Sequence, residues 1–347
     1  MAYANPKIQW EISEQVNLGL EMTFLNGLFD FTIDVYQAVR HNILGQRTIV
    51  PASMGLGIEP YVNIGKTRSR GVDFAGKIQH SFSNSLWFIL NGTLTYNKVI
   101  YKAIEEGADV PAWQRKVGRD ISQQIGYIAE GLFQSQAEID RSPLQSGDVM
   151  PGDIRYRDVN GDGKISIDDA VPIGFPTQPR LVYGFSGTVY YKRFEFNFAF
   201  QGSGQRSLFL SSASLSPFVN DHALLTEIWN DHWSPENMKV RPFWPRLSTK
   251  SITEHNKEEA RSGQTDIRYS TYFMREVKFL RCQSLELAYT LPEKWVKKIR
   301  LQRVKPYVRV NNPFLISNFK LWDVELGSNG FNYPIQRTYS VGVNLTF

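Results

Sequence analysis

The sequence predicts an all-β protein, an antiparallel up-and-down meander that forms part of a transmembrane β-barrel. Three observations support this prediction. Apolar and polar residues alternate over much of the 347-residue chain. Short and long connections between these segments follow each other in strict alternation. The alternating segments also exceed the strands of about 5–6 residues that are usual in soluble sheets. A period of two separates the two faces of a strand, whereas a helix would mix them.

The first two strands show the alternation most clearly. In the segment 8–24, eight of the nine even positions are apolar, and Glu14 is the exception. The odd positions of that segment are polar or glycine. The second strand is expected at 29–43, where Phe29, Phe31, Ile33 and Val35 alternate with Asp30, Thr32 and Asp34. Each of these strands therefore has one apolar and one polar face.

The later strands follow the same rule. The third strand, 66–82, places Val72, Phe74, Ile78 and Phe82 on one face. Six more strands are expected at 86–104, 180–191, 194–206, 273–290, 301–312 and 335–347. The strand at 301–312 has the weakest pattern, because Pro306 interrupts it and proline cannot donate a ladder hydrogen bond. The chain therefore contains about nine strands.

The connections between these strands are informative because their lengths alternate. Short connections are expected at 25–27, 83–85, 192–193 and 291–300, and long ones at 44–65, 105–179, 207–272 and 313–334. In a meander, alternate connections lie at opposite ends of the sheet, so every long loop falls at one end. Outer-membrane barrels have this asymmetry, with short periplasmic turns and long extracellular loops. A soluble antiparallel sandwich or barrel would show the same alternation with its apolar face inward, but it has no reason to gather the long loops.

The composition excludes several other classes. At 42% hydrophobic residues the chain is not intrinsically disordered, and a single cysteine excludes a disulfide scaffold or a Cys-based metal site. A net charge of +5 is too weak to indicate a nucleic-acid partner. No apolar run approaches the roughly 18 residues of a membrane helix. The first residues lack the pattern of a signal peptide, so we expect an N-terminal part that this sequence does not include.

The last eight residues, SVGVNLTF, form a recognisable terminal strand. Ser340, Gly342, Leu345 and Phe347 follow the order polar, glycine, hydrophobic and terminal aromatic. This pattern resembles the β-signal that the outer-membrane barrel assembly machinery recognises. An exposed edge strand with one apolar face is suited to pairing with a strand of another protein. The alternative is an ordinary terminal strand that ends in Phe.

Five short segments, taken in order, resemble the C-terminal part of the SusC/RagA-type TonB-dependent transporters. They are 5–11 (NPKIQWE), 63–74 (NIGKTRSRGVDF), 131–135 (GLFQS), 151–163 (PGDIRYRDVNGDG) and 333–337 (YPIQR). Each motif is loose by itself, but their order and spacing are specific. The resemblance covers nearly the whole chain.

This resemblance implies a location in the outer membrane of a Gram-negative bacterium and a barrel of about 22 strands. It also implies nutrient uptake of glycans or peptides, driven by the TonB complex and shared with a SusD-like lipoprotein. We expect residues 1–347 to be a partial barrel, because no segment of this sequence matches a plug domain or a TonB box. Contact with the TonB complex would then depend on the missing N-terminal part.

One segment of the longest loop resembles an EF-hand-type calcium loop. In 158–169 (DVNGDGKISIDD), Asp158, Asn160 and Asp162 would supply side-chain oxygens and Lys164 a backbone carbonyl. Gly163 would permit the sharp turn, and Asp169 would close the site. The expected cofactor is Ca²⁺, which would stiffen the loop. The alternative is a cluster of Asx and glycine turns in which the same side chains bond the backbone.

The loop 207–272 concentrates aromatic residues, namely Trp229, Trp233, Phe243 and Trp244. Exposed aromatic faces suit a ligand or a partner protein, and a loop that packs on itself would also use them. No nucleophile elbow, P-loop or H-E-x-x-H motif is present, so we expect no enzyme. The favoured function is outer-membrane nutrient transport. The alternative function is a soluble calcium-binding β-sheet protein that recognises carbohydrate.

Overall fold

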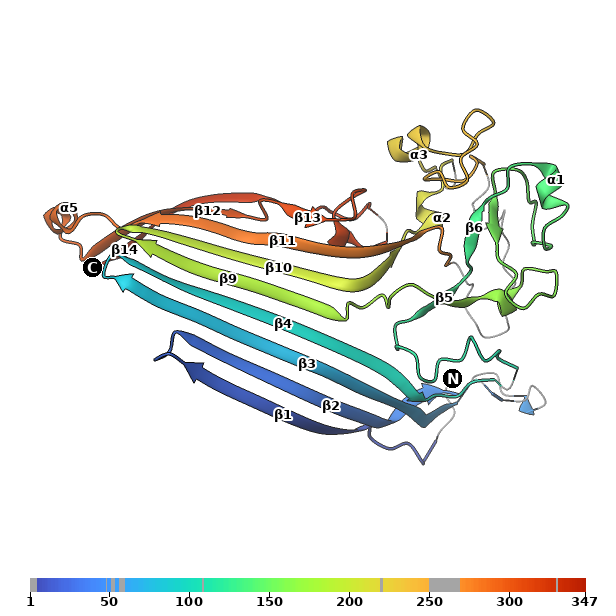
Figure 1. The fold of residues 1–347 in the computed structure, drawn as a ribbon, viewed down its shortest axis with the longest axis horizontal. Coiled ribbons are helices and arrows are strands. Elements are labelled where there is room, and N and C mark those ends of the chain that lie inside the picture. The colour runs from blue at the N-terminus through green and yellow to red at the C-terminus, as the bar shows by residue number, and fades with distance from the viewer. Residues whose placement is uncertain are drawn as a thin grey trace.

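One large sheet dominates the computed structural model, which describes residues 5–47, 49–50, 54–55, 60–107, 109–218, 221–249, 269–328 and 330–347 (Figure 1). Its strands are β1 Ile12–Phe24, β2 Phe29–Gln46, β3 Tyr61–Ser83, β4 Leu86–Ala103, β9 Leu181–Tyr191, β10 Phe194–Phe209, β11 Met274–Tyr289, β12 Arg303–Asn311, β13 Leu315–Ser317 and β14 Thr338–Thr346. The long strands lie where the alternation predicts them, and β4, β9 and β11 come within one residue of the predicted bounds.

The strand order is that of an antiparallel meander. It runs β1-β2-β3-β4-β9-β10-β11-β12-β14, with the short β13 pairing with β11. The described sheet is open between β1 and β14, as expected for part of a barrel. The predicted fold class is therefore confirmed. β2 and β3 extend further than their sequence patterns suggest, so the connection between them is 47–60 and not 44–65.

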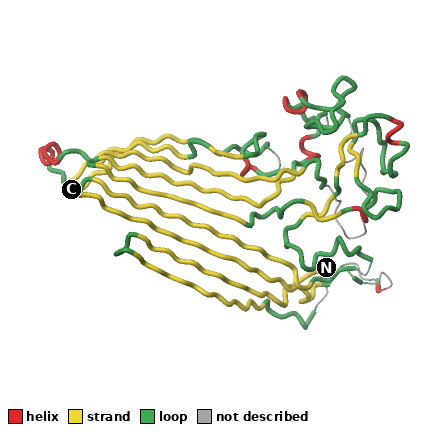
Figure 2. The backbone as a smooth tube through the Cα atoms, viewed as in Figure 1, coloured by secondary structure: helices red, strands yellow, loops and turns green. Residues whose placement is uncertain are grey.

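The two ends of the sheet differ, as the loop lengths predict (Figure 2). The tight turns at 25–28, 84–85 and 192–193 lie at the end that also holds the C-terminus. The turn that carries α5 Glu293–Val296 and η3 Lys297–Ile299 lies at this same end. The long connections gather at the opposite end, which in a membrane barrel is the extracellular end.

The apolar face of the large sheet is exposed. Leu18 on β1 and Val341 on β14 have exposed fractions of 76% and 82%, and Leu287 on the inner strand β11 is 52% exposed. Phe31 is on the same face but half-buried, and the Phe24 ring packs against it with centroids 5.5 Å apart. Apolar side chains cross the strands in register, as in the row Leu20, Ile33, Phe74, Leu94 and Tyr183. This outward apolar face is what a membrane barrel requires and what a soluble sandwich would cover.

The opposite face of the sheet carries a polar network. Lys305 Nζ lies 2.9 Å from a carboxylate oxygen of Glu195. Arg309 Nε donates to Glu286 at 2.7 Å, and Asn197 Nδ2 donates to the same carboxylate group at 3.1 Å. These residues come from β10, β11 and β12. Polar groups on this face fit the lumen side of a barrel.

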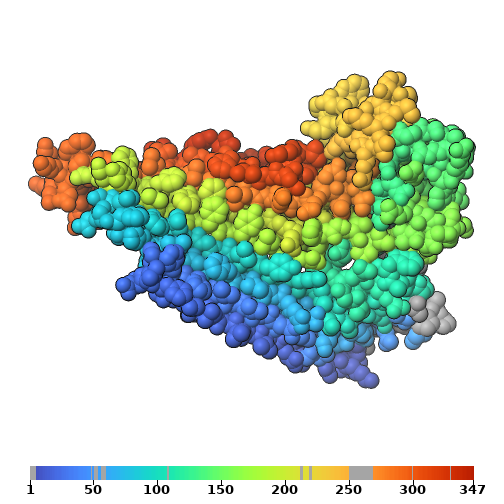
Figure 3. Space-filling view, viewed as in Figure 1, coloured from blue at the N-terminus to red at the C-terminus, as the bar shows by residue number. Residues whose placement is uncertain are grey.

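The described parts of the long connections 104–180 and 210–273 form a loop domain at the end of the sheet opposite the short turns, where the green and gold atoms of Figure 3 gather. It contains two small sheets, β5 Gln124–Gly126 with β8 Val171–Ile173 and β6 Ala129–Leu132 with β7 Ile154–Tyr156. Its short helices are α1 Gln136–Ile139, η2 Ile167–Asp169, α2 Ser212–Leu215 and α3 Thr226–Asn230. η4 Val324–Leu326 belongs to the last long connection. No helix among the described residues is long and apolar enough to cross a bilayer.

Candidate functional site

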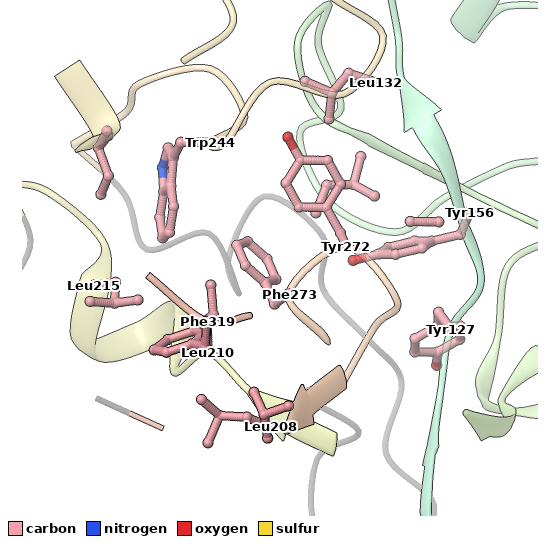
Figure 4. Close-up of a cluster of buried hydrophobic side chains, with 14 of the residues drawn as sticks. Tyr127, Leu132, Tyr156, Leu208, Leu210, Leu215, Trp244, Tyr272, Phe273 and Phe319 are labelled. Carbon is pink, nitrogen blue, oxygen red and sulfur yellow. The ribbon is translucent and has the colours of Figure 1, made fainter. Parts of the chain in front are cut away.

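The loop domain has its own hydrophobic core (Figure 4). Trp244 packs with Phe273, their ring centroids 5.3 Å apart, and Tyr272 lies next to Phe273 at 5.2 Å. Tyr127 and Tyr156 come from the other long connection and pack at 5.2 Å. The core also includes side chains from the ends of β10 and β11, so it joins the loops to the barrel wall. The loop domain is therefore fixed to the sheet.

Backbone hydrogen bonds join the two long connections within this domain. The Leu132 N–H donates to the Val240 carbonyl at 3.0 Å, and the Arg246 N–H donates to the Gly152 carbonyl at 3.0 Å. Arg246 Nε also lies 2.8 Å from a carboxylate oxygen of Asp153, and both side chains are largely buried. Sequence reasoning missed this ion pair, although Gly152 and Asp153 lie in the motif 151–163 that carries the family resemblance. The motif indicated that Asp153 matters, but its partner Arg246 lies 93 residues away in the chain.

The four predicted aromatic residues have different surroundings. Trp244 has an exposed fraction of only 2%, Trp233 is also buried, and Phe243 packs against the same core. Trp233 Nε1 donates to the side chain of Gln134 at 3.2 Å. Trp229 on α3 is 63% exposed, with His232 beside its ring. The structure thus favours internal packing for three of these residues and leaves Trp229 as the one of the four that is free to meet a ligand or partner.

The predicted calcium loop is stabilised by side-chain to backbone hydrogen bonds. The Asp158 carboxylate accepts from the N–H groups of Gly161 and Gly163 at 2.7 and 2.8 Å. Asp162 Oδ1 accepts from the Lys164 N–H, and the Asn160 side chain accepts from the Asp162 N–H. A cluster of Asx and glycine turns, the alternative to a calcium site, has hydrogen bonds of this kind. A calcium loop can contain the same bonds.

Asp169 closes the loop from the other side. It is fully buried, and it accepts from the N–H groups of Val159, Asn160 and Ser166. Burial alone would raise the pKa of the Asp158 carboxyl, but backbone hydrogen bonds, first from Gly163, lower it below its usual value. Among the described residues, no three His, Cys, Asp or Glu side chains converge on one metal position. The calcium site stays a prediction.

A second carboxylate organises the aromatic loop. Asp231 accepts from Lys239 Nζ at 2.6 Å and from the Phe243 N–H at 2.9 Å. Burial opposes ionisation here, but the hydrogen bonds from Lys239 and Phe243 lower the pKa of Asp231. An ionised Asp231 therefore closes the loop between α3 and Trp244.

The residues predicted as an assembly signal lie on β14 and at its end. Ser340 and Gly342 pair with Arg309 and Tyr307 on β12, and Leu345 pairs with Val304. The Tyr307 ring lies over Gly342, where an added Cβ would meet it at 2.5 Å. Phe347 is 80% exposed. Among the described strands, β14 lies at the open edge of this partial barrel, and the assembly signal stays a prediction.

Comparison with known proteins agrees with this architecture. The family model described as "TonB dependent receptor-like, beta-barrel" matches residues 1–216. The chain is 28% identical over 371 residues to TonB-dependent receptor P26 of Formosa agariphila, covering 99% of this chain and 35% of that protein. It is 24% identical over 355 residues to TonB-dependent receptor SusC of Bacteroides thetaiotaomicron, covering 99% and 32%.

The fold is also that of a solved transporter. The structure titled "Structure of the RagAB peptide transporter" matches with a TM-score of 0.74 at 19% identity, over 99% of this chain and 36% of that chain. The chain thus spans about a third of the length of the curated relatives it matches. The resemblance found in the sequence motifs is confirmed. The chain belongs to the TonB-dependent receptor-like β-barrel family, whose members are outer-membrane proteins of Gram-negative bacteria.

Proposed function

We propose that this chain forms the C-terminal barrel portion of a SusC-like, TonB-dependent transporter that imports glycans or peptides across the outer membrane. The observation that carries the proposal is the exposed apolar face of the sheet, combined with long loops at one end only. A wall of this kind suits lipid on its outer side and a polar path on its inner side. Membership of the TonB-dependent receptor-like family supports the same function.

Each part of the chain has a role in this proposal. The apolar face contacts outer-membrane lipid, and the network around Glu195 and Glu286 lines the lumen. The loop domain presents Trp229 at the extracellular end, where a SusD-like lipoprotein or a nutrient would bind. A plug domain would gate the pore, and the TonB complex would supply the force for transport. The barrel assembly machinery would recognise β14. The chain itself would perform no catalysis.

The test is growth and uptake in the host bacterium. A strain without the gene would be compared with its parent on a panel of purified oligosaccharides and peptides, each as sole nutrient. We expect loss of growth on one nutrient class and recovery when the gene is restored. Normal growth of the deleted strain on every nutrient that the parent uses would contradict the proposal. Recovery of the protein in the soluble fraction of the periplasm would contradict it as well.

A further inference from the structure

The apolar outer face of the sheet is hollowed at one place. A groove with a volume of about 530 Å³ opens across β2, β3, β4, β9 and β10. Its walls are the side chains of Phe29, Phe31, Phe74, Phe185 and Phe198. These rings belong to the same face as the apolar rows that cross the strands. The groove is therefore continuous with the surface that meets lipid.

Two glycines lie in the floor of the groove, and the Phe74 ring covers one of them, Gly76, where an added Cβ would meet that ring at 2.9 Å. Gly76 on β3 pairs with Gly92 on β4, and Gly92 pairs with Phe185 on β9. A Cβ added at Gly92 would meet no atom within 4 Å. Packing inside the chain therefore does not require glycine at this position. Its consequence is an open space that a side chain would otherwise occupy.

The groove begins on the periplasmic side of the membrane. Gly92 lies six residues along β4 from Leu86, the first residue after a short turn. With a rise of about 3.3 Å per residue and a tilt of about 40°, Gly92 stands roughly 15 Å from that turn. Phe31 and Phe198 lie nearer the turns, since they are two and four residues from the starts of β2 and β10. Phe74 pairs with Leu94, eight residues along β4 from Leu86, and so stands roughly 20 Å from the turn by the same rise and tilt. The apolar band of such barrels is about 25 Å tall, so the groove extends from the periplasmic side to beyond the midplane.

Positive charge marks the same end of the sheet. Lys192 and Arg193 form the turn between β9 and β10, which supply one wall of the groove, and both are exposed. The rings of Tyr191 and Phe194 lie at the adjoining strand ends, where an aromatic girdle is expected. Lys192 Nζ lies 5.2 Å from the centre of the Tyr191 ring. A phosphate at this interface would find two cationic partners, and its acyl chain would point toward the groove.

We propose that this groove binds one acyl chain of an anionic phospholipid from the periplasmic leaflet, with the phosphate at Lys192 and Arg193. The inference rests on the outer-membrane location within the proposed function. A flexible hydrocarbon chain fills an irregular apolar hollow and restores the dispersion contacts that an empty groove forgoes. The basic turn selects a phospholipid over an uncharged occupant. The bound lipid completes the wall where side chains are missing.

The test uses photocrosslinking in vesicles. The protein, extracted from outer membranes, would be reconstituted with phosphatidylethanolamine and phosphatidylglycerol, a small part of the latter carrying a diazirine near the end of one acyl chain. After illumination, mass spectrometry locates the adducts along the chain. We expect them to concentrate on the segments 74–78, 90–92 and 185–198. Even labelling of all outer-face segments would overturn the proposal.

Two variants sharpen the test. Gly92→Phe places a ring in the groove and is expected to lower the yield there about tenfold, as lost burial of about two methylene groups implies. Val341→Phe adds the same ring to the outer face of β14, away from the groove, and should leave that yield unchanged. Circular dichroism and resistance of the barrel to unfolding in detergent check that both variants fold. An unchanged yield in a folded Gly92→Phe protein would overturn the acyl-chain site.

A charge-reversed protein, with Lys192→Glu and Arg193→Glu, tests the headgroup. It is expected to lower the phosphatidylglycerol yield at the groove, and an unchanged yield would overturn the phosphate assignment. Crosslinked protein dimers in place of lipid adducts would show that a second copy covers the groove, which also overturns the proposal. Failure of the proposed function looks different, because a protein outside the membrane would give no adduct on any outer-face segment, including the one around Val341.

Discussion

Arg281 on β11 donates from Nη2 to both carboxylate oxygens of Asp323, at 2.5 and 2.6 Å, and its Nε bonds Glu325 in η4. The arginine side chain is only 4% exposed. This pairing attaches the last long connection to the barrel wall. Removal of one partner of a buried ion pair destabilises the fold, because the other charged group stays buried without an opposite charge beside it.

Arg281→Met is therefore expected to destabilise the protein by about 3–5 kcal/mol, measured by denaturant unfolding of the barrel in detergent. Lys297→Met is the control, because it breaks an ion pair with Glu293 whose two side chains are both more than three-quarters exposed. That variant should change the free energy of unfolding by less than about 0.5 kcal/mol. Equal losses in the two variants would show that Arg281 and its partners do not stabilise the fold.

Gly152 should tolerate no side chain. Its φ is +92°, and an added Cβ would meet the Trp233 ring at 2.3 Å and the Arg246 Cβ at 2.7 Å. Gly152→Ala is expected to open the loop domain and raise its rate of proteolysis. Gly161→Ala is the control, because Gly161 has a φ of +76° and its added Cβ would meet no atom within 4 Å. This variant therefore has the backbone strain without a steric clash. That control should cost about 1 kcal/mol. If both variants resist protease equally, contact with Trp233 is not what requires the glycine.

Trp244 and Trp229 should behave in opposite ways. Trp244→Ala removes a ring from the core and is expected to cost about 3–5 kcal/mol of stability, seen as loss of the near-ultraviolet circular dichroism of the loop domain. Trp229→Ala removes an exposed ring and should change stability by less than about 0.5 kcal/mol. If Trp229 contacts a nutrient or a SusD-like partner, its removal weakens that binding in a folded protein. A stable Trp244→Ala protein would contradict the core assignment.

Millimolar calcium is expected to raise the melting temperature of the loop domain, because extracellular calcium loops bind with a Kd of about 10⁻⁴–10⁻³ M. Asp158→Ala should abolish this shift, since Asp158 would supply the first ligand. Asp168→Asn is the control, because Asp168 lies in the same loop outside the predicted ligand set. No calcium-dependent shift in the unmodified protein would remove the calcium hypothesis and leave the turn cluster as the full explanation.

The Asp231 contact should produce a pH-dependent stability. Its pKa in the folded protein lies below the unfolded value of about 3.9, so the folded state binds the proton less tightly. The stabilisation is therefore complete above about pH 5 and is lost as the pH falls through the lower, folded pKa. The difference in melting temperature between the parent and Asp231→Asn should be largest near neutral pH and shrink below about pH 4. A constant difference across this range would rule out the charge of Asp231 as its cause.

The fold was largely predictable because a strand with one apolar face has a period of two. The rows through Phe74 and Leu94 follow from that alternation and from the turn positions. The candidate site was less predictable. Trp229 and Trp244 lie in one loop and are both tryptophan, yet one is exposed and the other buried. Neighbouring positions in an irregular loop carry no periodicity that separates an inner from an outer face.

The sequence by itself determined the antiparallel meander, the separation of an apolar from a polar face and the gathering of long loops at one end, since these depend on local alternation and spacing. Only the tertiary structure decided which distant groups meet. The ion pairs Arg281 with Asp323 and Arg246 with Asp153 join segments 42 and 93 residues apart. The groove on the apolar face likewise combines residues of five strands, β2, β3, β4, β9 and β10, which the register brings together. Such meetings depend on register and loop closure, which no local pattern encodes.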